Sequence, residues 1–197
     1  MNTKFLTAVG LAAGLMGFVT AAQAVPIAAG SALSLNGNDS YTATATSFTI
    51  TFSNPANVGA ATGSFTALAP LPATGAATMI ASLSNTTAAG FTLYTATVGA
   101  VTTDLVAASI SGFSFTPATP TTLASLTVNG AGTLDLTGFT PTPGIFSITT
   151  QGPTSAAVTF SATSVASAVV PEPASLTLLG SALIGLGWLG RRRRKVM

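Results

Sequence analysis

Hydrophobic and polar residues alternate along several short segments between residues 25 and 170, as in β-strands with one buried face. Phe48, Ile50 and Phe52 fall on one face of such a segment, with threonines between them. No segment of this region has the 3.6-residue spacing of an amphipathic helix. The pattern therefore predicts a domain built of strands, which also include residues 91–98 and the pair Phe113 and Phe115.

Turn residues divide these strands and predict two hairpins. The first turns at Asn-Gly-Ala-Gly (129–132) and the second at Gln-Gly-Pro-Thr (151–154). Many short strands with frequent turns favour an all-β fold, either an antiparallel β-sandwich or a partly open barrel, over residues 25–160. Residues 54–90 are its weakest part and read as either loop or loosely ordered chain, and residues 161–169 read as a linker.

The domain is made largely of small residues. Ala, Gly, Ser and Thr supply 88 of the 146 residues between positions 25 and 170, so the core depends on phenylalanines and scattered Leu, Ile and Val. Whole-domain disorder is the main structural alternative, but disorder usually needs high net charge. The many hydroxyls leave a second alternative open, which is O-glycosylation of a threonine-rich surface.

Charged residues lie almost entirely at the two ends of the chain. Of six Lys and Arg residues and four Asp and Glu residues, only Asp39, Asp104 and Asp135 fall between positions 25 and 170. We expect each to be a solvated turn or edge residue, and Asp39 follows a turn-like Asn-Gly-Asn at 36–38. A domain without basic residues has nothing to neutralise phosphates, which excludes nucleic acid as a partner.

The composition also argues against an enzyme. The chain has no His and no Cys, which removes the commonest general base, the thiolate nucleophile and the usual zinc ligands. The three aspartates belong to no recognisable motif. We expect no catalytic residue, no metal site and no cofactor.

The first 24 residues have the three parts of a secretory signal peptide. Lys4 gives a positive start, an apolar stretch follows, and Ala22 and Ala24 place small side chains at positions −3 and −1. We predict cleavage between Ala24 and Val25 by signal peptidase after passage through the secretory translocon. The alternative is an uncleaved N-terminal anchor.

The C-terminal segment 170–197 has the features of a short membrane span. Residues 174–190 carry no charge and would form a helix about 25 Å long, near the lower limit for a bilayer core of about 30 Å. Five basic residues follow this run, and such a block stays on the cytoplasmic side. These basic-tail residues are Arg191, Arg192, Arg193, Arg194 and Lys195.

Before the span, Val170, Pro171, Glu172 and Pro173 form an extended, proline-stiffened stretch. A proline-glutamate-proline motif, a short glycine-rich apolar helix and a terminal arginine cluster, in this order, resemble the PEP-CTERM sorting signal of Gram-negative bacteria. The resemblance implies export and then recognition by an exosortase, a membrane-embedded, transpeptidase-like cysteine enzyme whose processing is linked to exopolysaccharide and biofilm loci. It implies that these four residues are the sorting and processing motif, and it says nothing of residues 25–169.

The sequence thus predicts an exported protein whose precursor is anchored in the inner membrane with its β domain outside the cytoplasm. We expect the mature domain to act as a structural or adhesive protein at the cell surface or in the extracellular matrix, with exopolysaccharide as a candidate partner. The alternative is a ligand- or polysaccharide-binding module that stays anchored to the membrane.

Overall fold

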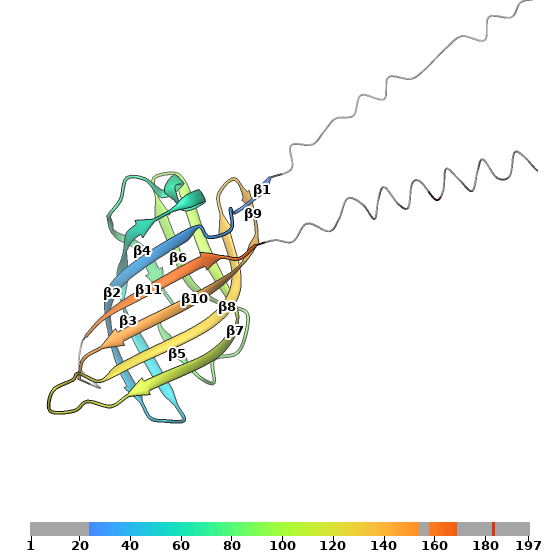
Figure 1. The fold of residues 1–197 in the computed structure, drawn as a ribbon. Helices are drawn as coiled ribbons and strands as arrows, with labels where there is room; N and C mark the ends of the chain where they lie inside the picture. The colour runs from blue at the N-terminus through green and yellow to red at the C-terminus, as the bar shows by residue number, and fades with distance from the viewer. Residues whose placement is uncertain (1–23, 154–157, 169–182, 184–197) are drawn as a thin grey trace, which may run out of the picture.

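The computed structural model describes residues 24–153, 158–168 and Leu183, and most of them belong to β-strands, which pair antiparallel except for one short pair (Figure 1). One short 3₁₀ helix, η1 (Gly63–Leu68), interrupts the order. The strands are β1 (Val25–Pro26), β2 (Ala32–Ala43), β3 (Phe48–Ala61), β4 (Ala73–Met79), β5 (Ser82–Ser84), β6 (Phe91–Val98), β7 (Val101–Thr116), β8 (Ser125–Leu136), β9 (Phe139–Thr140), β10 (Thr142–Gln151) and β11 (Val158–Ala166).

Eight of these strands close into a barrel. The ring order is β2-β11-β10-β8-β7-β6-β4-β3, and β2 closes it because it pairs with both β11 and β3. The small strand β5 continues along β3 beyond β4, and β1 and β9 form a separate parallel pair. The prediction of an all-β antiparallel fold is therefore confirmed. The sandwich alternative is wrong because the sheet closes on itself, and the barrel is closed where a partly open one was expected.

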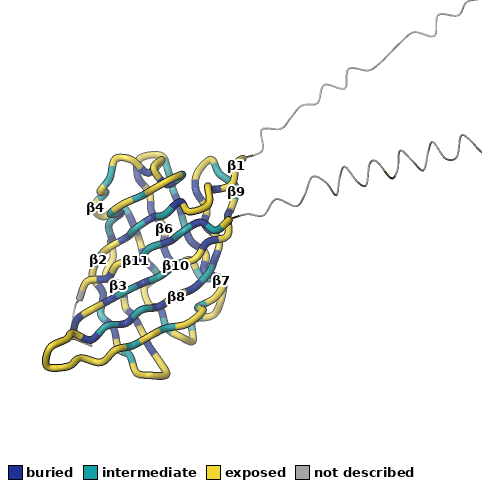
Figure 2. Tube along the Cα trace, in the orientation of Figure 1, coloured by how far each residue is buried: buried dark blue, intermediate teal, exposed yellow. Residues whose placement is uncertain are grey.

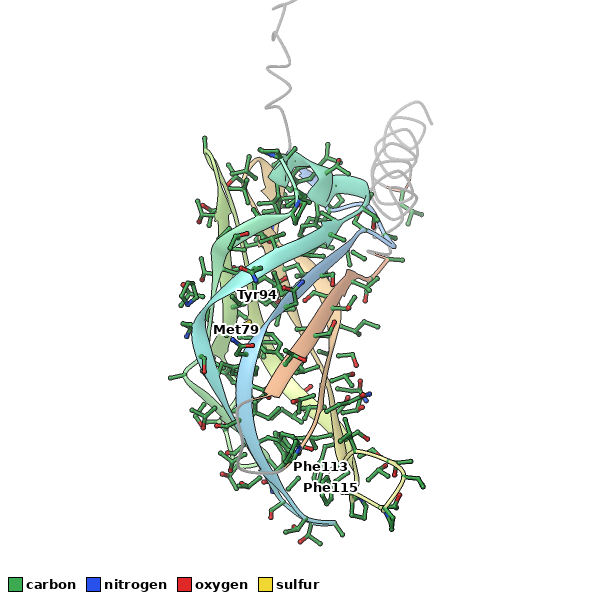
Figure 3. The ribbon with its side chains drawn as sticks, turned by 90° about the vertical axis from the view of Figure 1, so that its left-hand side faces the viewer. Met79, Tyr94, Phe113 and Phe115 are labelled. Atoms are coloured by element: carbon green, nitrogen blue, oxygen red, sulfur yellow. The ribbon has the colours of Figure 1, made fainter. Side chains whose placement is uncertain are left out.

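The barrel interior is filled with hydrophobic side chains, and buried and exposed residues alternate along the strands (Figure 2). The predicted face of Phe48, Ile50 and Phe52 points into this core. Met79 and Tyr94 lie about halfway along the barrel, and Phe113 and Phe115 lie near one end (Figure 3). Edge-to-face packing joins Phe52 to Phe160 at 5.0 Å between ring centres, and Phe48 packs on Phe113 at 4.9 Å. The few large side chains of the chain are thus gathered inside the barrel, where they form its core.

Glycines on the inner face make room for these rings. A Cβ on Gly37 would lie 2.8 Å from Cε1 of Phe160, and one on Gly130 would overlap the ring of Phe146. The turn predicted at 129–132 is therefore wrong: these residues lie within β8, and glycine there provides space for a facing side chain.

Two other segments that were predicted to be irregular also belong to regular elements. Residues 161–166 belong to β11, which pairs with β2 and β10, so the predicted linker is mostly part of the barrel. Residues 54–90 form ordered elements, because β3 extends to Ala61 and η1, β4 and β5 follow. The hairpin predicted around 151–154 is consistent with the antiparallel pairing of β10 and β11.

Both ends of the barrel chain emerge at the same rim. The amide of Ile27 donates to Thr142 Oγ1 at 2.9 Å, and the amide of Ser167 donates to the Pro143 carbonyl at 2.8 Å. The β7–β8 loop lies at the opposite end (Figure 1). The strand order begins at Val25, the first residue after the predicted cleavage site.

Within the described residues, no helix combines the length and hydropathy needed to cross a bilayer. The span predicted at 174–190 lies outside the described residues except for Leu183, and so do the basic tail and most of the signal peptide.

Candidate functional site

The outer surface of the barrel carries a large uncharged region of hydroxyl and amide side chains, which we call the neutral outer face. It covers five neighbouring strands in the ring, and none of its side chains is buried. Its members are Ser34, Asn36, Asn38, Ser40 and Thr42 on β2, Thr49, Thr51 and Ser53 on β3, Thr159, Ser161 and Thr163 on β11, Ser147, Thr149 and Gln151 on β10, and Ser125, Thr127 and Asn129 on β8.

Strand register aligns these side chains in rows across the sheet. Gln151 lies opposite Thr159, which lies opposite Asn38. Thr149 lies opposite Ser161 in the next row. Because successive residues of a strand point to opposite faces, the alternation that fills the core also produces these polar rows.

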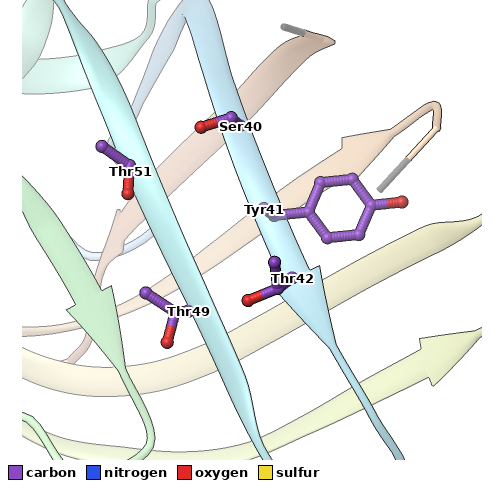
Figure 4. Close-up of a pocket in the computed structure, with 5 residues that line it drawn as sticks. All are labelled: Ser40, Tyr41, Thr42, Thr49 and Thr51. Carbon is purple, nitrogen blue, oxygen red and sulfur yellow. The ribbon is translucent and has the colours of Figure 1, made fainter. Parts of the chain in front are cut away.

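Two shallow hollows lie on the neutral outer face. The first, of about 210 Å³, lies over β2 and β3 and is lined by Ser40, Tyr41, Thr42, Thr49 and Thr51. The four hydroxyl side chains lie along the two strands while the Tyr41 ring points away from them (Figure 4).

The second hollow, of about 220 Å³, lies over β10 and β11 and is lined by Thr149, Gln151, Thr159, Phe160 and Ser161. Both hollows offer neutral hydrogen-bond donors and acceptors and no charge. Such a lining fits an uncharged, hydroxyl-rich ligand better than an ion.

Asp39 does not lie in a turn, as the sequence predicted, but on β2 with its side chain inside the barrel. It is 1% exposed, and its Oδ1 accepts a hydrogen bond from Thr150 Oγ1 at 3.0 Å, while Oδ2 has no partner among the described residues. Burial raises the pKa of this carboxyl to about 6, although the Thr150 bond partly opposes the shift. Nearby, the Tyr41 hydroxyl donates to the Gly152 carbonyl at 2.9 Å. Asp39 is thus a buried acid in the core.

The other two aspartates, distant in sequence, lie side by side. Asp104 on β7 and Asp135 on β8 are directly opposite in the register, with Asp104 half-buried and Asp135 exposed. Partial burial and the neighbouring Asp135 charge raise the pKa of Asp104. No local sequence pattern indicates this pairing, because it depends on the β7–β8 register.

We expect Asp135→Asn to stabilise the protein at pH 7 by about 0.5 kcal/mol, because like charges directly opposite each other on a sheet repel. The gain should shrink in high salt, which screens exposed charges. Denaturant unfolding of the two proteins at low and high ionic strength measures both effects. An equal gain in both salts would show that charge repulsion is not its cause.

Among residues 24–153, 158–168 and Leu183, no three acidic, histidine or cysteine side chains gather into a metal-binding group. Of the sites predicted from sequence, Ala24 and Val25 are described and exposed. Ala22, the sorting residues Val170 to Pro173 and the basic tail lie outside the described residues.

Comparison with known proteins identifies the tail but not the barrel. Residues 169–194 match the family model described as the PEP-CTERM protein-sorting motif. This confirms the predicted sorting signal and indicates exosortase-dependent sorting of an exported protein. No curated protein matches the chain. No solved structure matches it either.

Proposed function

We propose that this chain is a structural or adhesive protein of the cell surface or extracellular matrix, and that its barrel is the mature part. In this proposal the N-terminal signal directs export, the C-terminal span holds the precursor in the inner membrane, and an exosortase-like enzyme processes the chain near Pro171 and Pro173. The PEP-CTERM match at 169–194 is the observation that carries it.

The barrel supports a non-enzymatic role. The chain has no His or Cys, and the buried Asp39 carboxyl is hydrogen-bonded to Thr150 in the core, away from the outer hollows. An uncharged surface of hydroxyls and amides suits hydrated neutral surroundings such as an exopolysaccharide matrix, because it exchanges hydrogen bonds without attracting counter-ions.

A second candidate is a ligand- or polysaccharide-binding module that stays at the membrane. The two hydroxyl-lined hollows favour it, since both lie on the neutral outer face and offer only neutral hydrogen-bonding groups. Retention separates the two candidates: a permanently anchored module keeps its basic tail, whereas a matrix protein loses it.

We expect the mature protein from its native host to begin at Val25 and to lack the residues that follow about position 173. The double substitution Pro171→Ala and Pro173→Ala should leave the tail attached, because it removes the extended recognition stretch. Intact-mass measurement of protein from the medium and from membranes gives both ends, and any attached sugar, in one experiment.

Pro117→Ala with Pro120→Ala is the matched control, because these prolines lie in the exposed β7–β8 loop of the barrel. It should be processed like the wild type. An intact tail in the wild-type protein, unchanged by either double substitution, would contradict the proposed processing.

A further inference from the structure

Half of strand β7 has a hydrogen-bonded neighbour on one side only. β8 accompanies it as far as Thr116, but its pairing with β6 ends where Phe91 lies opposite Ala107. The Gly90 amide donates to the Ala107 carbonyl at 2.8 Å, and no further backbone bond of this kind follows among the described residues. Residues 108–116 therefore form a free sheet edge nine residues long.

This free edge lacks the charges and prolines that commonly protect an edge strand against pairing, and two β-bulges are the protective feature it retains. Natural edges are blocked by charged side chains, by proline or by being very short, but the sequence ASISGFSFT contains no charge and no proline. Irregularities between Ala107 and Ser109 and between Ile110 and Gly112 bend it locally. Phe113 and Phe115 are half-buried, so apolar surface accompanies the unpaired backbone.

We propose that the free edge of β7 pairs antiparallel with the same edge of a second copy of the chain. This assembly goes beyond the proposed surface or matrix role. Antiparallel pairing of two identical segments has a two-fold axis. All nine residues are paired only if this axis passes through the pair of Gly112 residues, since Gly112 is the midpoint of 108–116. Ile110 then lies opposite Ser114 of the second copy, and Ser111 opposite its Phe113.

The location and charge of the edge favour a second copy as the occupant. The chain's own tail leaves the barrel beside Pro143, at the rim opposite the β7–β8 loop that follows the edge. The edge carries no charge that would select a charged partner. The barrel has only three aspartates, and all lie outside residues 108–116, so two copies meet there with little repulsion.

Disulfide trapping in the full chain tests this pairing. The chain has no cysteine, and a Cβ at Gly112 would meet nothing within 4 Å, so Gly112→Cys introduces a single thiol without a clash. Directly opposite residues of an antiparallel pair lie about 4.5–5.5 Å apart at Cα, which a disulfide spans. Mild oxidation of cell envelopes should convert most of the Gly112→Cys protein into a disulfide-linked dimer.

Ser161→Cys is the matched control, because it places a thiol on the exposed outer face of β11. It should form at least about fivefold less dimer. Adding Ser114→Lys to Gly112→Cys should abolish most of the dimer by placing charge on the edge, while the thermal unfolding temperature stays near that of Gly112→Cys alone.

Three results would overturn the proposal: no dimer with Gly112→Cys, equal dimer at both thiol positions, or a cross-link from position 112 to a different protein. Because none of these measurements depends on cleavage of the tail, failure here is distinguishable from failure of the proposed processing.

Discussion

Replacing Gly130 with alanine should destabilise the barrel by about 3 kcal/mol, and so lower its melting temperature by roughly 10 °C. Gly130 lies on the inner face of β8, and an added Cβ would overlap both the Phe146 ring and the Ser109 carbonyl oxygen. The ring can turn away only within a packed core, and the carbonyl belongs to the neighbouring strand, so neither neighbour yields cheaply. Thermal and denaturant unfolding measure the loss.

Gly112→Ala is the control on the neighbouring strand. Its Cβ would meet nothing within 4 Å, so the substitution should be neutral or stabilise slightly by restricting the unfolded chain. Equal stabilities of the two variants would contradict the close packing of β8 against Phe146.

The second large effect concerns pH. Asp39 has a pKa of about 6 in the folded protein, against an ordinary value of 3.8, so the folded state binds its proton more tightly than the unfolded chain does. Its stabilising contribution is therefore complete below about pH 4 and is lost as the pH rises to 6. A shift of this size corresponds to about 3 kcal/mol as an upper value.

We expect Asp39→Asn to remove this pH dependence, because the amide keeps the shape and the Thr150 hydrogen bond but does not ionise. The variant should be more stable than the wild type by about 1–2 kcal/mol at pH 8. This gain is smaller than the upper value because the buried amide nitrogen still lacks a hydrogen-bond partner. At pH 4 the variant should be as stable as the wild type or less stable. Unfolding of both proteins at several pH values measures the difference between their stabilities. The contributions of the other titrating groups are the same in both proteins and cancel in this difference.

A constant difference between pH 4 and pH 8 would show that the Asp39 carboxyl is solvated and that its burial in the core is wrong. Asp135→Asn, at an exposed position, serves as the comparison: it keeps Asp39 and should therefore still lose stability between pH 4 and 6, as the wild type does.

Local patterns predicted the strands that carry large side chains. The alternation of Phe48, Ile50 and Phe52 with threonines leaves only one orientation that buries the rings. The same reasoning failed where small residues fill the core. Ala162 and Ser164 are buried in β11, but they bury little area, so their alternation resembles a linker.

Pairing between strands that are distant in the sequence could not be predicted from local patterns. Closure depends on β2 pairing with β11, which lies at the other end of the domain's sequence, as well as with β3, which follows it directly. This closure determines that Asp39 lies inside the barrel beside Thr150, and the β7–β8 register brings Asp104 to Asp135. The polar rows of the neutral outer face likewise arise only when the registers align them.

The shared rim of the two chain ends has a mechanical consequence. Strands β2 and β11 are antiparallel, so the start of one and the end of the other lie together, with Ala32 opposite Val165. Tension between the two ends would unzip this pair one bond at a time. Tension between the tail and a contact at the far end would instead load the bonds along β11 together, in shear. A barrel anchored by its tail and held at its distal end would thus resist pulling. The same barrel pulled between its two chain ends would open.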